Sequence, residues 1–167
     1  MNALKITVFF IFFSHINIHF SQNNKIIPEP YEQTIKQGFF YSIESPDIIT
    51  ESDFNSAATL LKDALKKLNF KSDKKSKNII KFTTNKNLDV EQYTLSINPK
   101  EIQIEASSNL GALHAFQSLN QLILFNNKKG VLKIQSQIIN DSPRFKYRGM
   151  HLDVGRHMYS LDFIKKY

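Results

Sequence analysis

Two runs of alternating apolar and polar residues, joined by a three-residue turn, constrain the fold of this chain most. Residues 93–97 place Tyr, Leu and Ile at every second position, and residues 102–106 repeat the alternation with Ile, Ile and Ala. The turn between them, Asn98-Pro99-Lys100, has residues that interrupt regular structure. Because successive side chains of a strand point to opposite faces, each run predicts a strand with one buried face. The two runs indicate an antiparallel pair in a half-buried sheet.

Two stretches with helical periodicity lie on either side of this pair. In the first, Thr50 and Asp53 are candidate caps, and the apolar positions are Phe54, Ala57, Leu61, Ala64, Leu65 and Leu68. The second runs from residue 109 to about 125 behind a Ser107-Ser108 cap, and its apolar positions are Leu110, Leu113, Phe116, Leu119 and Ile123. Such stripes are typical of helices that cover a core, so we expect both to pack on the sheet.

Further strands are expected at residues 78–84 and 131–139, the second of them after a turn at residues 127–130. Residues 33–43 predict a hairpin that turns near Lys36-Gln37-Gly38. The fold class is therefore α/β or α+β, with a small, mostly antiparallel sheet and two helices.

The first 21 residues have the three zones of a secretory signal. Lys5 gives a short basic start, residues 6–13 are apolar without interruption, and Ser21 precedes a polar stretch that begins at Gln22. The apolar run is shorter than the roughly 20 residues that span a bilayer, so no integral membrane segment is expected. The pattern predicts a signal peptide over residues 1–21 and a secreted or periplasmic protein. A buried strand of a cytosolic domain is the alternative.

The formal charge is +7 at neutral pH, and most of the excess is lysine. A basic balance is compatible with binding to nucleic acid or to an anionic surface. However, the lysine cluster at residues 71–77 contains neither arginine nor an aromatic residue and is interpreted as a solvated loop. No nucleic-acid partner is expected. His114 has no second ligand at helical spacing, so it is interpreted as a hydrogen-bonded imidazole, and no metal or cofactor is expected.

The C-terminal stretch carries all three arginines of the chain: Arg144, Arg148 and Arg156. Asp141-Ser142-Pro143 marks a domain boundary before it, and residues 148–157 predict a strand that ends in a charged cluster and leads into a helix at residues 160–167. Such βα units place binding side chains at the strand end in (β/α)8 barrels. A guanidinium fork there suits a polyhydroxyl or carboxylate ligand. The alternative is that the arginines pair with Asp141, Asp153 and Asp162 at a domain junction.

Two groups of residues resemble glycoside hydrolase family 20, the β-N-acetylhexosaminidases. Arg148-Gly149, Leu152-Asp153, Arg156-His157 and residues 163–167 match the opening of its catalytic barrel in order and spacing, with Gly155 in place of a small Ser or Ala. Residues 93–97, 102–106 and 117–122 resemble its N-terminal accessory domain. The resemblance implies an accessory α/β domain at residues 22–143, followed at residues 144–167 by the first βα element of an incomplete (β/α)8 barrel.

The resemblance also implies an activity. Members of this family remove terminal N-acetylhexosamine from chitin oligomers or glycoconjugates by substrate-assisted retaining hydrolysis, in which the substrate's acetamido oxygen attacks the anomeric carbon. The catalytic Asp-Glu pair is expected beyond Tyr167, in the missing remainder of the barrel, so the fragment alone is expected to be inactive. Arg156 matches the arginine that binds sugar hydroxyls, and Asp153 and His157 are expected to support it. The alternative is a secreted noncatalytic module that binds a glycan or a partner.

Overall fold

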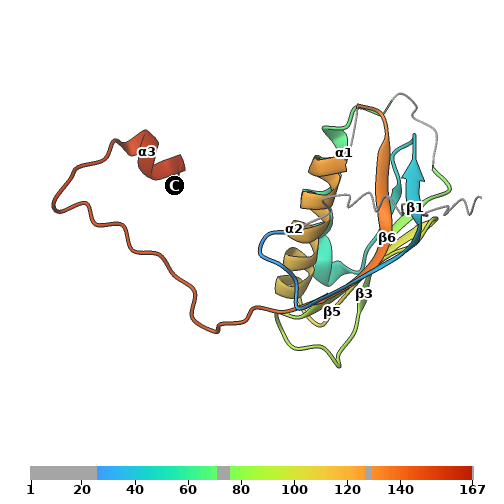
Figure 1. The fold of residues 1–167 in the computed structure, drawn as a ribbon, viewed down its shortest axis with the longest axis horizontal. Helices are drawn as coiled ribbons and strands as arrows, with labels where there is room; N and C mark the ends of the chain where they lie inside the picture. Colours follow the sequence, from blue (N-terminus) through green and yellow to red (C-terminus); the bar gives the residue numbers. More distant parts are fainter. Residues whose placement is uncertain (1–25, 71–75, 127–128, 167) are drawn as a thin grey trace, which may run out of the picture.

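The computed structural model describes residues 26–70, 76–126 and 129–166. Within these ranges six strands form one sheet in the order β1-β6-β4-β5-β3-β2 (Figure 1). The strands are β1 (Glu32–Ser42), β2 (Asp47–Ile49), β3 (Ile79–Thr84), β4 (Tyr93–Ile97), β5 (Glu101–Ala106) and β6 (Leu132–Asp141). The helices are the short 3-10 turn η1 (Ser52–Phe54), α1 (Asn55–Lys66), α2 (Asn109–Asn126) and α3 (Leu161–Lys166).

The predicted antiparallel pair is confirmed. β4 and β5 pair antiparallel, with Tyr93 opposite Ala106 and Ile97 opposite Ile102. β4 and β1 each pair antiparallel with β6, whereas β3 is parallel to both β5 and β2. The parallel β2-β3 pair follows from α1, because parallel neighbours need a crossover connection and a helix supplies it. The sheet is therefore mixed and mostly antiparallel.

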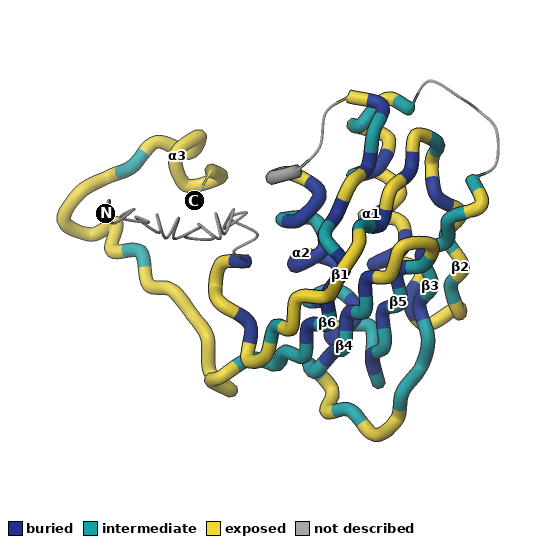
Figure 2. Tube along the Cα trace, turned by 45° about the vertical axis from the view of Figure 1, so that its right-hand side comes forward, coloured by how far each residue is buried: buried dark blue, intermediate teal, exposed yellow. Residues whose placement is uncertain are grey.

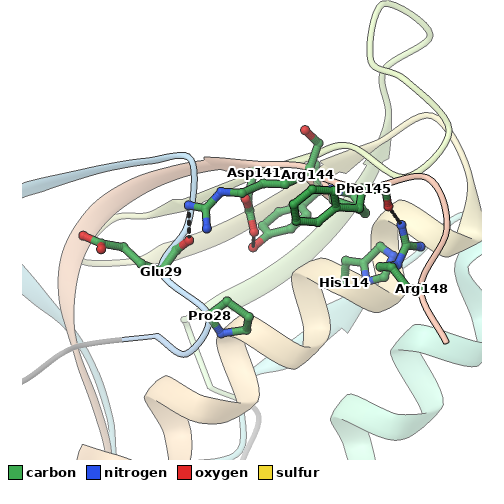
Figure 3. A pocket seen from close by; sticks show the side chains of 10 residues that line it. Pro28, Glu29, His114, Asp141, Arg144, Phe145 and Arg148 are labelled. Carbon is green, nitrogen blue, oxygen red and sulfur yellow. Dashed lines mark hydrogen bonds between the residues drawn. The ribbon is translucent and has the colours of Figure 1, made fainter. Parts of the chain in front are cut away.

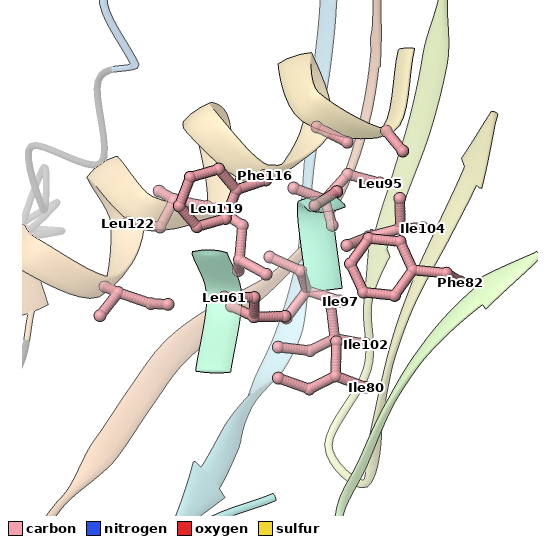
Figure 4. Packing of buried hydrophobic residues seen from close by; sticks show 14 of the residues in the cluster. Leu61, Ile80, Phe82, Leu95, Ile97, Ile102, Ile104, Phe116, Leu119 and Leu122 are labelled. Carbon is pink, nitrogen blue, oxygen red and sulfur yellow. The ribbon is translucent and has the colours of Figure 1, made fainter. Parts of the chain in front are cut away.

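The two long helices cover one face of the sheet, and the core lies between the layers (Figure 4). The predicted core face of α1 and η1 is confirmed, because Phe54, Ala57, Leu61 and Leu65 are buried and Ala64 and Leu68 pack against the cluster. On α2, Phe116, Leu119 and Ile123 are buried and Leu113 packs against the core, as predicted. Leu110 is 50% exposed, so its assignment to the core was wrong. Ala112 and Ala115 are buried instead, and their small side chains let the helix approach the sheet closely.

The two helix caps differ in outcome. The Ser108 hydroxyl accepts hydrogen bonds from the backbone N–H of Leu110 at 3.1 Å and of Gly111 at 3.4 Å, which confirms the predicted cap of α2. The predicted caps of α1 are wrong. Phe54 occupies the cap position of α1 without a side-chain hydrogen bond, and Thr50 donates its hydroxyl to the carbonyl of Glu51. The turn η1 leads the chain into the helix in their place.

The hairpin predicted at residues 33–43 is also wrong. Residues 33–42 lie in one strand, β1, which pairs with β6 on both sides of an irregularity. The register shifts between Ile35, opposite Gln137, and Phe39, opposite Gln135. Gly38 has φ +92°, and the Gln135 side-chain amide donates to the carbonyls of Lys36 and Gly38 at 2.6 and 2.9 Å. The turn-forming residues therefore produce a bulge within a strand, not a reversal of the chain.

After β6 the chain leaves the sheet in an extended, largely exposed path that ends in α3 (Figures 1 and 2). The strand predicted at residues 148–157 is not formed, because a strand needs a hydrogen-bonded neighbour and none of the described strands lies beside this segment. The predicted helix is confirmed at Leu161–Lys166, where the Ser160 hydroxyl accepts from the Phe163 N–H at 3.2 Å.

Several sequence predictions concern residues outside the described ranges, in whole or in part. Among them are the signal peptide at residues 1–21, the lysine cluster at residues 71–77 and the turn at residues 127–130. Among the helices within the described ranges, none is long and apolar enough to cross a bilayer.

Candidate functional site

The extended C-terminal segment presents Arg156 to solvent and holds it by one ion pair. The Arg156 side chain is 92% exposed, and its Nε donates to Asp153 Oδ2 at 2.9 Å. Asp153 Oδ1 accepts from the Gly155 N–H at 2.8 Å. This backbone hydrogen bond, followed by that from Arg156, holds the pKa of the Asp153 carboxyl below its ordinary value. A compact turn of four residues therefore brings Asp153 and Arg156 together.

The geometry of this turn leaves the outer end of the guanidinium available. Asp153 contacts Nε, and the terminal nitrogens Nη1 and Nη2 belong to a side chain that is almost fully exposed. Two adjacent N–H groups in a rigid plane can donate to vicinal oxygens, a geometry that lysine lacks.

His157 does not join this pair. Its ring packs edge-on against Tyr159 with centroids 4.9 Å apart, and Tyr159 stacks on Phe163 of α3 at 4.7 Å. His157 is thus placed with the aromatic side chains that lead into the helix. Its predicted supporting role would act through the conformation of the segment, not through contact with Arg156.

A cavity of about 370 Å³ lies where the C-terminal segment leaves the sheet (Figure 3). It is lined by Pro28, Glu29, Tyr93, His114, Asp141, Ser142, Pro143, Arg144, Phe145 and Arg148. Arg144 donates to the Glu29 carbonyl at 2.9 Å. Of the lining residues, Tyr93 has its hydroxyl 2.6 Å from Ser118 Oγ and 3.3 Å from Asp141 Oδ2. Burial raises the pKa of Tyr93 well above its ordinary value, so this hydroxyl stays protonated.

Beside this cavity, Glu91 connects α2 with the C-terminal segment. Its Oε1 pairs with Arg148 Nη2 and lies 3.3 Å from His114 Nε2. The hydrogen bond from His114, and then that from Arg148, lowers the pKa of the Glu91 carboxyl. The prediction that His114 is a hydrogen-bonded imidazole is confirmed. The sequence gives no sign of the role of Glu91, because this residue lies in a turn before β4, where no periodic pattern marks a contact.

The alternative interpretation of the arginines is correct for one pair only. Arg156 pairs with Asp153, as that interpretation expected. Arg148 pairs with Glu91, and Arg144 bonds a backbone carbonyl. Within residues 26–70, 76–126 and 129–166, no three His, Cys, Asp or Glu side chains converge as metal ligands would.

Comparison with known proteins identifies relatives over most of the chain. The family model described as glycosyl hydrolase family 20, domain 2, matches residues 23–142. A beta-hexosaminidase of Vibrio furnissii is 43% identical over 83 residues, which are 50% of this chain and 13% of that protein. Beta-hexosaminidase 3 of Arabidopsis thaliana is 46% identical over 69 residues, which are 40% of this chain and 13% of that protein.

A solved structure agrees with the fold. The family 20 exo-β-N-acetylglucosaminidase of Vibrio harveyi, crystallised with N-acetylglucosamine, superposes with a TM-score of 0.69 at 32% identity. The superposition covers 84% of this chain and 22% of that one. The chain thus spans between 13% and 22% of the length of these relatives. The family model accounts for well over half of the chain, and this protein belongs to glycosyl hydrolase family 20.

Proposed function

We propose that this chain is the N-terminal part of a secreted β-N-acetylhexosaminidase that releases terminal N-acetylhexosamine from chitin oligomers or glycoconjugates. The main support for the proposal is the order of two matches along the chain, the first to the family model and the second to the barrel motif. The family model covers residues 23–142, and the Arg148 to His157 motif follows it at the spacing of the barrel opening. Residues 22–143 then form an accessory domain, and residues 144–167 begin the catalytic barrel.

Exposure of the C-terminal segment supports this arrangement. Several large apolar side chains there are mostly exposed: Phe145, Tyr147, Met150, Met158 and Leu161. Soluble proteins seldom leave so many apolar groups of one segment uncovered, and such surfaces usually meet another part of a protein. The remaining strands and helices of a barrel would cover them.

Arg156 is the residue of this chain that we assign to substrate binding. Its free fork donates two charge-assisted hydrogen bonds to vicinal sugar hydroxyls, and Asp153 fixes the plane of the guanidinium through Nε. An aspartate is ionised at neutral pH, and the lowered pKa of Asp153 extends the pH range of this contact to more acidic values. The substrate's acetamido group acts as the nucleophile. The acid/base Glu and its neighbouring Asp belong to a later barrel strand.

The decisive test is the nucleotide sequence that follows the codon of Tyr167. An open frame of roughly 250 or more residues with a neighbouring Asp-Glu pair is expected, because a barrel needs that length. The encoded parent should hydrolyse an aryl N-acetylglucosaminide, and residues 1–167 alone should not. An immediate stop codon would favour a noncatalytic glycan-binding module. Reproducible turnover by the 167-residue chain would show that the catalytic assignment is wrong.

Export belongs to the same proposal and rests on the basic, apolar and polar zones of residues 1–21. Mass spectrometry of the secreted or periplasmic protein should find a new N-terminus near Gln22. An intact Met1 on protein recovered from the cytoplasm would contradict the signal peptide.

A further inference from the structure

Glu91 stands on a turn that is held in place from several sides. The Gln92 N–H donates to the Asp89 carbonyl at 3.0 Å, and the Gln92 side chain accepts from the Asp89 N–H at 3.1 Å. Ser107 donates its hydroxyl to the same Asp89 carbonyl at 2.9 Å. These hydrogen bonds link the turn to Ser107, just before α2. The Glu91 carboxylate therefore extends from a turn whose backbone is held in place.

Arg148 connects this turn to the C-terminal segment in two ways. Its Nη2 pairs with Glu91 Oε1, and its Nη1 donates to the Phe145 carbonyl at 2.5 Å, three residues earlier in the chain. The side chains of Glu91 and Arg148 are 33% and 44% exposed, so solvent screens the pair less than it screens the Asp153–Arg156 pair. The Arg148 guanidinium thus bonds within its own segment and binds that segment to the sheet domain, the six-stranded sheet with α1 and α2 at residues 26–141.

Arg148 is also the last such contact before Arg156. In the described part of the chain, no residue from 149 to 156 makes a charged contact with the sheet domain, and Arg156 itself pairs only with Asp153. Arg148 is therefore the charged anchor from which the path of the chain to Arg156 starts.

We propose that Glu91 is a positioning residue: through Arg148, its carboxylate holds the start of the C-terminal segment, which continues to Arg156, against the sheet domain. His114 supports Glu91 by donating to the same carboxylate oxygen. The inference rests on the proposed function only in so far as Arg156 binds substrate. The docking of Arg148 on Glu91 is a property of this chain and can be measured without the parent enzyme.

Trypsin measures the docking directly, because its specificity pocket must take up the arginine side chain before cleavage. In the full chain, the bond after Arg148 should be cut more slowly than the bond after Arg156, which serves as an internal reference. Glu91→Gln should raise the Arg148-to-Arg156 ratio of cleavage rates about two- to fivefold, the effect expected for a partly exposed ion pair. His114→Ala should raise the ratio less, and His114→Gln, which keeps a donor, should restore it.

Glu29→Gln is the matched control. It removes the same charge beside the same cavity, but Glu29 binds Arg144 through its backbone carbonyl, which the substitution leaves in place. The ratio should therefore stay at the wild-type value. An unchanged ratio in Glu91→Gln, or an equal rise in Glu29→Gln, would overturn the proposal. Thermal melts establish that each variant is folded.

The parent enzyme separates this inference from the proposed function. Glu91→Gln should raise KM for an aryl N-acetylglucosaminide about two- to fivefold with little change in kcat, because Arg156 contributes binding that substrate and transition state share. A fully active parent whose KM is insensitive to Glu91 would refute the positioning role and leave the function intact. If the parent is inactive but Glu91→Gln still raises the trypsin ratio, the proposed hexosaminidase function is refuted and the docking of Arg148 on Glu91 stands.

Discussion

At the scale of residues, the three arginines of the chain have three different partners. Arg144 bonds the Glu29 carbonyl, Arg148 pairs with the half-buried Glu91, and Arg156 pairs with Asp153 in an exposed turn. Hydrogen bonding lowers the pKa of Glu91. A carboxyl whose pKa is lower in the folded than in the unfolded chain stabilises the fold at every pH above its ordinary pKa, and this stabilisation is lost as the pH falls through the folded pKa. The contact between Glu91 and Arg148 is therefore complete at neutral pH.

Arg156→Lys in the parent enzyme tests the binding role of the exposed fork. A lysine keeps the charge but loses the two parallel donors, and each charge-assisted hydrogen bond contributes about 1.5–3 kcal/mol. We expect kcat/KM for an aryl N-acetylglucosaminide to fall on the order of ten- to a thousandfold. Stability should hardly change, because the side chain is 92% exposed.

Arg148→Lys is the matched control for that variant. It makes the same chemical change eight residues earlier in the chain, where the partner is Glu91. Arg148→Lys should change kcat/KM by no more than about fivefold. This change should parallel the loss of stability and of the contact with Glu91. If Arg156→Lys keeps normal kinetics, or loses activity only in proportion to unfolding, Arg156 is a structural ion-pair residue.

At the scale of elements, α2 approaches the turn before β4 closely. Gly111 lies in the first turn of α2, and a Cβ added there would lie 2.4 Å from the backbone oxygen of Gln92. It would also lie 3.2 Å from the Cβ of Ala106 in β5. The missing side chain lets the helix sit against the Glu91 turn, and this places His114 within reach of Glu91.

Gly111→Ala should therefore destabilise the domain, by about 1–3 kcal/mol, because the added methyl meets backbone that cannot rotate away. Chemical denaturation measures the change. Gly155→Ala is the control: its Cβ would meet only a carboxylate oxygen of Asp153 at 3.3 Å, the end of an exposed side chain that can move. Its effect should stay within about 0.5 kcal/mol. Equal stability of the two variants would show that the approach of α2 to this turn is not tight.

At the scale of the whole molecule, the buried apolar core lies entirely within residues 26–139. The segment after residue 143 adds no buried residue within the described part of the chain, as the exposed path in Figure 2 shows. Its contacts with the sheet domain are polar ones at Arg144 and Arg148 and the cavity contacts of Phe145. The sheet and its two long helices therefore hold the elements of an independent folding unit.

Removal of residues 144–167 should leave a single cooperative thermal transition, because it removes no part of the core. We expect the midpoint to fall by no more than a few degrees, the effect of losing one or two polar contacts in a domain of this size. Calorimetry on the truncated chain measures both quantities. A broad, noncooperative transition would show that the C-terminal segment is part of the folding unit.

The apolar periodicity of the sequence predicted the buried face of β4, β5, α1 and most of α2. Tyr93, Leu95, Ile102 and Ile104 alternate with polar residues and are all buried. Leu61 and Leu119 lie on helical stripes that form the core, as their spacing predicted. These features are local, because the period of a strand or helix sets which side chains share a face. The family resemblance could also be recognised from local features, because it rests on short motifs in a fixed order.

The way in which distant segments meet follows from the fold and has no signal in the sequence. Gly38 forms a bulge instead of a hairpin because β6, almost 100 residues away, pairs with β1 on both sides of it. Residues 148–157 have the pattern of a strand but no neighbour to pair with among the described strands. Glu91 and Arg148 are 57 residues apart and carry no shared periodicity. Pairing between segments depends on which backbone and charged groups the fold brings together, and no local pattern contains that information.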